Sequence, residues 1–173
     1  RLLAGERAAQ EQLRAIFDEA QQLSRCASWV SDRSGNLTWA SQQYLDMLGV
    51  TAETCPRTIP DFITRFVDDP AQAEESRANA VKHSAGEPTE GTRRLCLPDG
   101  TIRWIMFRNI PRVDSRGIAI GSLGIGRDIT EERAAFADLA ARTATLETAK
   151  LIAGLGTWTW YAEGDVLVTC DYM

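Results

Sequence analysis

The sequence predicts an α+β fold in which a five-stranded antiparallel sheet carries short helices on one face and is flanked by a helix at each end. Three observations lead to this prediction. Residues 7–25 are rich in Ala, Gln, Glu, Arg and Leu and residues 130–153 are rich in Ala, and neither segment contains Gly or Pro, as is typical of helices. A short strand pair follows the first of these segments, and three strand-like segments precede the second. The stretch between them is interrupted by Pro and Gly, which permits only short helices and one longer helix.

The N-terminal helix, residues 1–25, has apolar residues at a seven-residue spacing. This spacing is typical of a coiled-coil seam. Leu13, Ile16 and Leu23 are therefore candidate contacts of a dimer helix, and we expect a homodimer. The seam is short and partly made of alanine, so an amphipathic helix that packs on its own domain remains the alternative.

Turn and capping residues divide the middle of the chain. Residues 27–32 and 36–40 form the expected strand pair around a Ser-Gly turn. Ser41 is placed to cap a helix that ends at Gly49. A short helix is expected at 62–66, and a longer one from Pro70 to about Ser84.

The second half of the chain predicts an antiparallel meander and then a long helix. Its strands are expected at 90–97, 101–113 and 118–126, with turns at Pro98-Asp99-Gly100 and at residues 114–117. Thr130 opens the final helix, which runs to about Ala153 and carries two Glu residues in its first turn, where the helix dipole favours them.

Three runs of residues have the order and spacing of the landmarks of a known family. They are Trp29 to Trp39 followed by Tyr44 and residues 47–49, the Asp-Gly segment 94–105, and Gly124 to Glu131 with its Asp-Ile-Thr sequence. On these residues the chain resembles the PAS domain family over about residues 26–131. One departure is Val67-Asp68-Asp69-Pro70, where many members of the family have Val-His-Pro-Asp-Asp.

The resemblance implies four parts: the N-terminal helix at 1–25, a PAS domain at 26–129, a linker or signalling helix at 130–153, and the truncated start of a second PAS domain at 154–173. The last part rests on an internal repeat, because Trp29, Gly35 and Leu37 recur as Trp158, Gly164 and Val166. The chain does not begin with Met, so we expect it to be a segment of a larger signalling protein.

Composition narrows the classes of partner. With 19 basic and 24 acidic side chains the net charge is −5, and no basic run or stripe stands out, so nucleic acid is not expected as a partner. No apolar run reaches the roughly 20 residues of a membrane span. The four cysteines form no Cys-x-x-Cys pair, which indicates reduced thiols and a cytoplasmic location. Membrane attachment elsewhere in the parent protein stays open.

A ligand pocket between the sheet and the helices is one hypothesis for function. Strand alternation and helix faces suggest apolar lining residues, with plain core packing as the alternative. The arginines Arg94, Arg103 and Arg108 would bind a carboxylate if one pointed inward, although strand arginines usually face water. The candidate pocket residues are Tyr44, Phe62, Phe66, Leu95, Leu97, Met106 and Leu123.

The expected cofactor is none, or an unidentified small molecule. Haem would need an axial ligand, and His83, the single histidine, is expected to be solvated at a helix end. A light-sensing flavin domain would need its cysteine in a different local sequence from that around Cys55. No metal site is expected.

No catalytic residue is expected, because phosphate-binding loops, nucleophile elbows and paired acid–base groups are missing from the sequence. Asp128 and Thr130 are candidate signal-transmission residues at the start of the final helix. Two functions remain open: a ligand-sensing regulatory domain, and a ligand-free dimerisation spacer. The resemblance implies adjacent PAS and output domains as partners, with a two-component sensor histidine kinase or a diguanylate cyclase as the output.

Overall fold

The computed structural model describes residues 12, 19, 26–153, 158–161 and 166–169. The chain divides into two units, Arg1–Thr130 and Glu131–Met173. From residue 26 to Thr130 the first unit contains a sheet and three helices, and the described part of the second contains most of a long helix and a strand pair.

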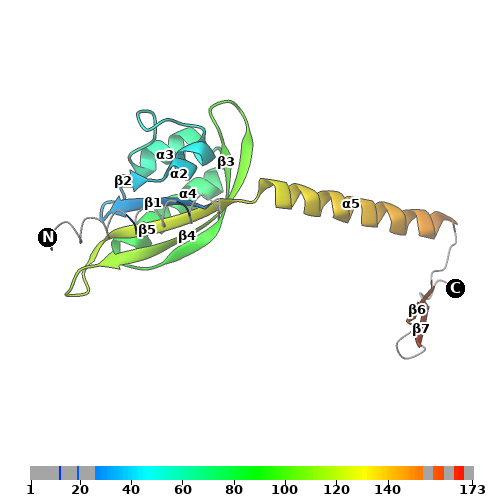
Figure 1. Ribbon diagram of the computed structural model, residues 1–173. Coiled ribbons are helices and arrows are strands. Elements are labelled where there is room, and N and C mark those ends of the chain that lie inside the picture. The colour runs from blue at the N-terminus through cyan, green and yellow to red at the C-terminus, as the bar shows by residue number, and fades with distance from the viewer. Residues whose placement is uncertain (1–11, 13–18, 20–25, 154–157, 162–165, 170–173) are drawn as a thin grey trace. The chain divides into compact units, whose positions relative to one another are not determined.

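The sheet of the first unit has five strands, all paired antiparallel, which confirms the predicted fold class. The strands are β1 (Ala27–Asp32), β2 (Leu37–Ala40), β3 (Thr89–Cys96), β4 (Ile102–Val113) and β5 (Ala119–Asp128). Their order across the sheet is β2-β1-β5-β4-β3 (Figure 1). The first and last strands therefore meet in the interior of the sheet, where residues 27–32 of β1 pair with residues 121–126 of β5.

Three helices lie against one side of this sheet (Figure 1). They are α2 (Gln42–Leu48), α3 (Ile59–Phe66) and α4 (Pro70–Ser84). Ser41 caps α2, as predicted, and Gly49 ends it in the left-handed conformation with φ of 64°, which glycine adopts without strain. The side chain of Asp69 accepts a hydrogen bond from the Ala71 amide and so caps α4. The predicted helices in this region are all present.

The core lies between the helices and the inner face of the sheet. Leu48 and Phe66, from the helices, are completely buried, and they pack with Leu95 and Ile105 from the strands. Burying a side chain of this size stabilises the fold by roughly 1.5–3 kcal/mol. The inward positions of β4 and β5 alternate with exposed ones, as expected for a sheet with one covered face.

The opposite face of the sheet carries several exposed apolar side chains. Met106, Ile110, Leu123 and Ile125 are 46%, 49%, 39% and 45% exposed. No helix of the described part of the first unit covers these residues. The sheet therefore has an apolar outer face, defined here by these four side chains.

In the second unit, α5 (Thr130–Ala153) matches the predicted helix, and its side chains from Glu131 to Glu147 are all exposed. Strands β6 (Trp158–Tyr161) and β7 (Val166–Thr169) pair antiparallel with each other. A strand pair at this place agrees with the internal repeat, and its assignment to a second domain stays a prediction. The predicted dimer contacts Leu13, Ile16 and Leu23 lie outside the described residues.

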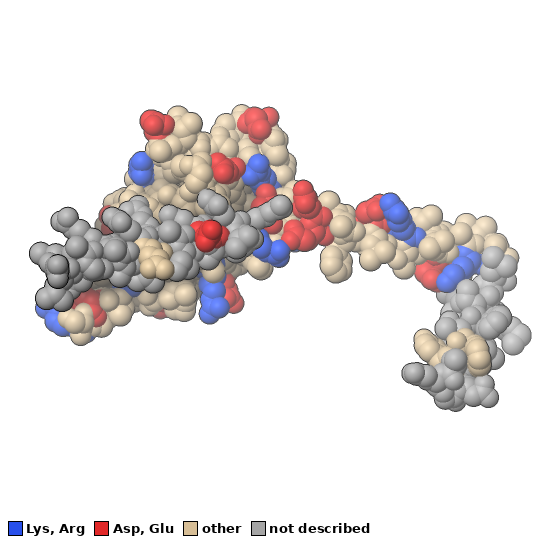
Figure 2. Space-filling view, viewed as in Figure 1, with Lys and Arg blue, Asp and Glu red and all other residues tan. Residues whose placement is uncertain are grey.

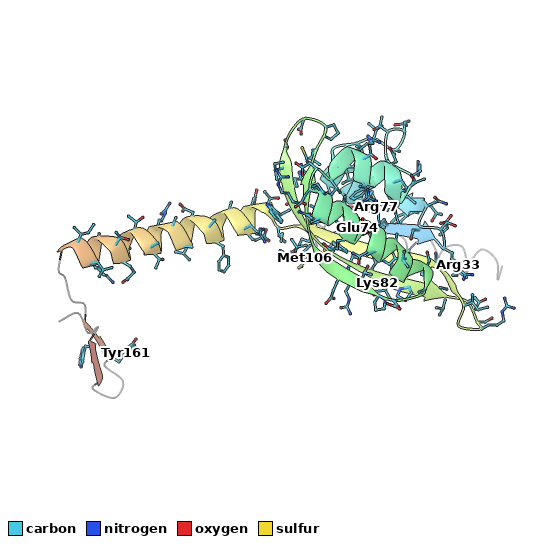
Figure 3. The ribbon with its side chains drawn as sticks, turned by 180° about the vertical axis from the view of Figure 1, so that it is seen from behind. Arg33, Glu74, Arg77, Lys82, Met106 and Tyr161 are labelled. Carbon is cyan, nitrogen blue, oxygen red and sulfur yellow. The ribbon has the colours of Figure 1, made fainter. Side chains whose placement is uncertain are left out.

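Charged side chains of both signs are interspersed over the surface. On the side of the molecule drawn in Figure 2, Lys and Arg lie next to Asp and Glu among the described residues. On α4, Arg77 pairs with Glu74 at 3.1 Å, and Figure 3 shows these two side chains and Lys82 along the outside of the helix. No helix in the described part of the chain has the length and apolar character of a membrane span.

Candidate functional site: a cavity between the sheet and the helices

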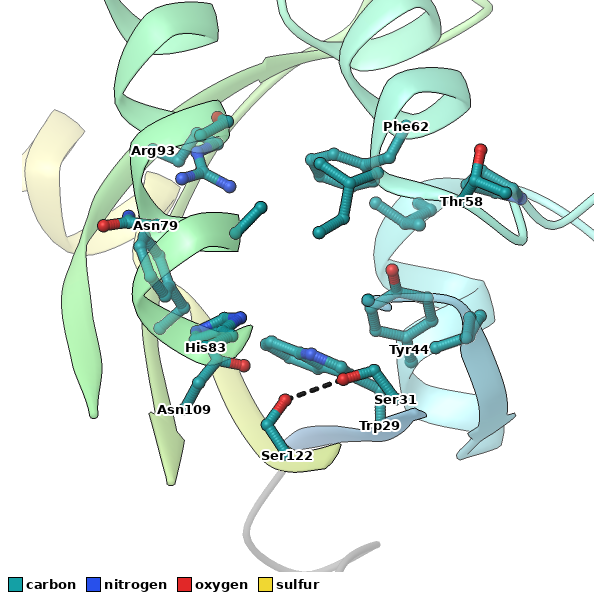
Figure 4. A pocket seen from close by; sticks show the side chains of 18 of the residues that line it. Trp29, Ser31, Tyr44, Thr58, Phe62, Asn79, His83, Arg93, Asn109 and Ser122 are labelled. Atoms are coloured by element: carbon teal, nitrogen blue, oxygen red, sulfur yellow. Dashed lines mark hydrogen bonds between the residues drawn. The ribbon is translucent and has the colours of Figure 1, made fainter. Parts of the chain in front are cut away.

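A cavity of about 120 Å³ lies between the inner face of the sheet and the three helices (Figure 4). This volume holds several water molecules or one small organic molecule. Its walls differ in character: one is formed by aromatic and aliphatic side chains, and the other carries polar and charged groups. Its lining includes Trp29, Tyr44, Phe62, Asn79, Ala80, His83, Arg93, Leu95, Phe107, Asn109 and Ser122.

Trp29 forms the floor of the cavity because its cross-strand partner is a glycine. Trp29 pairs in register with Gly124, and a Cβ atom at position 124 would overlap the indole ring of Trp29 and the Oδ1 atom of Asn109. The indole therefore lies over the bare backbone of β5. Beside it, the hydroxyls of Ser31 and Ser122 form a buried hydrogen bond of 2.7 Å between β1 and β5 (Figure 4).

The apolar wall is formed mainly by Tyr44 and Phe62 (Figure 4). Ser41 positions Tyr44, since its hydroxyl accepts hydrogen bonds from the Tyr44 amide at 3.2 Å and from the Ser28 amide of β1 at 3.0 Å. The Tyr44 ring contacts the Trp29 ring with centroids 5.2 Å apart. Burial raises the pKa of the Tyr44 phenol well above its usual value, so this hydroxyl remains a neutral donor.

Arg93 is the charged group of the polar wall that faces the cavity; the other arginine of the lining, Arg57, is exposed and donates a hydrogen bond of 3.0 Å to the Ala52 carbonyl. The Arg93 guanidinium lies over the Phe107 ring, 4.7 Å from the centroid, an arrangement that favours a cation over an aromatic face. Burial lowers the pKa of Arg93, and the negative charge of the nearby Glu75 opposes this shift. The guanidinium stays protonated, since an arginine pKa remains far above neutral pH. Figure 4 shows Arg93 and Phe62 facing each other across the cavity.

His83 lies in the polar wall rather than in solvent, so the expectation of a solvated helix-end histidine was wrong. Its Nε2 atom is 2.5 Å from the Thr89 hydroxyl, which also accepts a hydrogen bond of 3.3 Å from the Asn109 amide. The Thr89 hydroxyl and Nε2 share one hydrogen bond, and the histidine tautomer sets which of the two is the donor. Burial, and to a lesser extent the charge of Arg93, lowers the pKa of His83. Both effects favour the neutral imidazole.

Two buried amide atoms in the cavity lining have no hydrogen-bond partner among the described residues. They are Nδ2 of Asn79 and Oδ1 of Asn109, and the two residues are 9% and 5% exposed. An unpaired buried polar atom costs about 1–3 kcal/mol. A ligand or ordered water that paired with these atoms would recover part of this cost.

Only some of the predicted pocket residues line the cavity. Tyr44, Phe62 and Leu95 do. Phe66 and Leu97 are buried in the core beside it, at 0% and 4% exposure. These two side chains contribute to packing and not to the cavity wall.

Met106 and Leu123 lie on the apolar outer face of the sheet, so their assignment to the pocket was wrong. Figure 3 labels Met106 on its strand. On β4 both faces carry apolar side chains, so alternation alone could not decide which one faced inward. On β5 the pattern was misleading, because the inward positions are Ser122, Gly124 and Gly126, and the large apolar side chains point outward.

The three arginines considered for carboxylate binding do not line the cavity. Arg94 pairs with Asp68 through contacts of 2.5 and 2.7 Å, and Arg108 lies 3.6 Å from Glu90. Arg93, which points into the cavity, was not among the predicted residues. The signal was present, because Leu95 was expected to point inward and Arg93 is two positions before it on the same strand.

Asp128 and Thr130 join the end of the sheet to the start of α5. The Oδ1 atom of Asp128 accepts hydrogen bonds from the Thr130 amide at 2.9 Å and from the Thr130 hydroxyl at 2.5 Å. The Thr130 hydroxyl in turn accepts a hydrogen bond of 2.9 Å from the Trp104 amide of β4. The first residue of the helix is thus tied to two neighbouring strands.

Arg103 connects this junction to a wall of the cavity. Its guanidinium donates hydrogen bonds of 3.0 Å to the carbonyls of Asp46 and Met47 at the end of α2. The same guanidinium lies 3.6 Å from Asp128. Because Tyr44 and Met47 of α2 line the cavity, a displacement of α2 would act on Asp128 through one side chain.

Comparisons with known proteins agree with this architecture. The family model described as the PAS fold matches residues 11–129. The virulence sensor protein BvgS of Bordetella pertussis is 35% identical over 106 residues, which cover 60% of this chain and 8% of that protein. The chain thus corresponds to a small part of the length of its curated relative.

Two solved structures show the same fold. The PAS domain of Bordetella pertussis BvgS has a TM-score of 0.52 at 29% identity, covering 82% of this chain and 98% of that one. A sensory box histidine kinase/response regulator from Burkholderia thailandensis has a TM-score of 0.56 at 19% identity, covering 76% of this chain and 98% of that one. At 19% identity, the similarity to the Burkholderia protein shows a common fold and nothing further.

Proposed function

The chain belongs to the PAS family, and from this premise we propose that it is the sensory module of a bacterial signal-transduction protein, in which a small molecule in the cavity changes how α5 begins. It carries no catalytic role of its own in this proposal. The ligand acts by favouring one of two arrangements of the helices relative to the sheet.

The observation that carries the proposal is the polar wall of the cavity. A filled hydrophobic core would pair its buried polar atoms or omit them. Here an arginine, a histidine and two amides with unpaired atoms surround open volume. Such groups cost stability unless something binds to them, which supports a ligand site over simple packing.

Transmission is proposed to run from α2 through Arg103 to Asp128 and Thr130. A ligand that displaced α2 would move the two carbonyls that Arg103 binds. The distance between the Arg103 guanidinium and the Asp128 carboxylate would then shorten or lengthen. This carboxylate accepts the hydrogen bond of the first amide of α5. The start or rotation of the helix is the output of the module.

The wider context follows from the relatives. We propose a homodimer in the cytoplasm, with neighbouring PAS and output domains on the same chain and a histidine kinase or diguanylate cyclase as the output. BvgS is named as a virulence sensor protein, which supports a sensory role for the similar segment of this chain. The cavity is smaller than the roughly 300–1,000 Å³ of drug-sized sites, which supports a ligand smaller than haem or a flavin.

Filling the cavity tests the proposal. Ala80 and Ala78 both lie on α4; Ala80 lines the cavity and Ala78 is exposed. We expect Ala80→Leu to change hydrogen–deuterium exchange of the amides at residues 128–134 by about fivefold, which corresponds to about 1 kcal/mol in local opening. Ala78→Leu, the matched control, should leave these amides unchanged.

An Ala80→Leu variant that remains folded, with unchanged exchange at residues 128–134, would contradict a sensory role for the cavity. That result would favour the second candidate, a ligand-free dimerisation spacer. The apolar outer face of the sheet supports this alternative, since exposed apolar patches often mark interaction surfaces. If the chain is a spacer, sedimentation experiments should show a dimer. Substitutions of Leu13, Ile16 and Leu23 should weaken this dimer, and substitutions in the cavity should not.

A further inference from the structure

We propose that the ligand of the cavity is a small organic carboxylate, held by Arg93 at its charged end and by the aromatic wall at its apolar end. This inference rests on the proposed function, because it names the class of molecule that the sensory site takes. It follows from the charge, the geometry and the size of the cavity.

The charged residues of the lining are Arg57 and Arg93, of which Arg57 is exposed and donates a hydrogen bond to the Ala52 carbonyl, so Arg93 is the charge that faces the cavity. Among the described residues that line the cavity, none is Asp or Glu. Glu75, the carboxylate that acts electrostatically on Arg93, is exposed and does not line the cavity. A cation that is largely removed from water is costly unless an anion or several hydrogen bonds compensate it. A ligand carboxylate supplies the missing charge.

The geometry of Arg93 suits a carboxylate group. Its guanidinium lies over the Phe107 ring, 4.7 Å from the centroid, and Figure 4 shows it directed into the cavity opposite Phe62. A guanidinium donates two parallel hydrogen bonds to a carboxylate, and this arrangement is specific as well as strong. An arginine that already lies against an aromatic ring loses less side-chain freedom on binding than an arginine in solvent.

Other groups of the lining also favour an anion over a cation. The Tyr44 phenol remains protonated and acts as a donor, and Nδ2 of Asn79 is a donor without a partner in the described structure. The Nε2 atom of His83 is hydrogen-bonded to the Thr89 hydroxyl, and burial lowers the pKa of this histidine, which disfavours a second positive charge beside Arg93. The unpaired acceptor in the lining is Oδ1 of Asn109.

The opposite wall indicates the rest of the ligand. Trp29, Tyr44 and Phe62 present aromatic surface to the cavity, and apolar contact with these rings favours an aromatic or branched aliphatic body. The volume of about 120 Å³ limits this body to a single small ring or a short branched chain. Long fatty acids exceed this size. A polar dicarboxylate would place its second carboxylate against the aromatic wall, since the other arginine of the lining, Arg57, is exposed and hydrogen-bonded to the Ala52 carbonyl.

Phenylacetate and isovalerate are suitable probes, and phenylacetamide and isovaleramide are their neutral counterparts of the same shape. Binding to the full 173-residue chain is measured by isothermal titration calorimetry. We expect each carboxylate to bind about 10- to 100-fold more tightly than its amide, the range of a hydrogen-bonded charge pair. Ala80→Leu should abolish binding of all four compounds.

Arg93→Gln should reduce the affinity for the carboxylate to that for the amide. Arg93→Lys should give an intermediate affinity, because lysine keeps the positive charge but cannot donate two parallel hydrogen bonds to one carboxylate. Arg108→Gln is the matched control, since Arg108 is exposed on the neighbouring strand. Circular dichroism checks that each variant is folded. Should Arg93→Gln prove unfolded, the comparison of acid with amide on the unsubstituted chain decides the matter.

Three outcomes would overturn the carboxylate inference: neither carboxylate binds, the amides bind as tightly as the acids, or Arg93→Gln leaves the affinity unchanged. These are distinguishable from failure of the sensory role. If the carboxylates bind as expected but exchange at residues 128–134 does not respond, the ligand class holds and the signalling role fails. If Ala80→Leu alters that exchange but no carboxylate binds, the signalling role holds and the ligand class fails.

Discussion

Replacing Gly124 with Ala should destabilise the domain by about 2 kcal/mol. The new methyl group would overlap the Trp29 ring and Oδ1 of Asn109, and overpacking of this kind typically costs about 1–3 kcal/mol. Displacing the indole also weakens its contact with Tyr44, and such aromatic pairs contribute about 0.5–1.5 kcal/mol. The lower entropy of the unfolded Ala chain offsets about 0.4–1 kcal/mol of the loss.

Two other strand glycines provide a graded comparison. A Cβ atom at Gly126 would lie 3.1 Å from the Trp29 ring, and one at Gly91 would lie 3.4 Å from the Phe107 ring, close to ordinary contact distance. Urea unfolding followed by circular dichroism should therefore rank the losses as Gly124→Ala, then Gly126→Ala, then Gly91→Ala, the last within about 0.5 kcal/mol of the parent chain. The first variant should melt about 10 °C lower.

A double substitution tests the cause. In a Trp29→Leu background the smaller side chain leaves room for the methyl group, so Gly124→Ala should cost less than half of what it costs in the parent chain. If Gly124→Ala is as stable as Gly91→Ala, or if its cost is the same in both backgrounds, then the close approach of Trp29 to β5 is not what requires glycine at this position.

Two further predictions concern the junction with α5 and the polar wall. Replacing both Asp128 and Thr130 with Ala removes the contacts that hold the first turn of α5. We expect the free energy of unfolding to fall by about 1 kcal/mol, and Ala80→Leu should no longer change hydrogen–deuterium exchange at residues 128–134. Arg103→Gln should reduce this exchange response too, and a response retained in these variants would contradict the proposed path. Burial lowers the pKa of His83 below its usual 6.5, so protonation of this residue favours the unfolded chain. The free energy of unfolding should therefore have its full value above pH 6.5 and decrease as the pH falls below 6.5. His83→Gln should flatten this part of the pH profile in urea unfolding, and an unchanged slope between pH 7.5 and 5.5 would exclude His83 as its source.

The fold could be predicted because its boundaries depend on local chemistry. Ser41 and Gly49 enclose α2, and Pro70 stands in the first turn of α4. Each of these residues acts through its own backbone or its immediate neighbours, so the sequence shows the boundary directly. The order of the elements then leaves few antiparallel arrangements open.

The site was less predictable because it depends on which face of each strand points inward. Alternation divides a strand into two sets of residues without saying which set is buried. On β3 the expectation for Leu95 would have identified Arg93, had it been extended along the strand. Asn79, on a helix with weak amphipathic character, offered no such guide. Its role depends on the cavity beside it, which is a property of packing and not of local sequence.

The cavity itself arises from missing bulk on β5. Ser122, Gly124 and Gly126 occupy the inward positions of this strand, where a half-buried strand normally carries large apolar side chains. Trp29 covers the two glycines from the neighbouring strand, and the volume that it leaves beside Ser122 lies within the cavity. A prediction based only on the large apolar residues therefore assigns the wrong face of such a strand to the interior. Glycine and serine at alternate positions, opposite a tryptophan on the paired strand, are therefore the sequence feature that should indicate a cavity here.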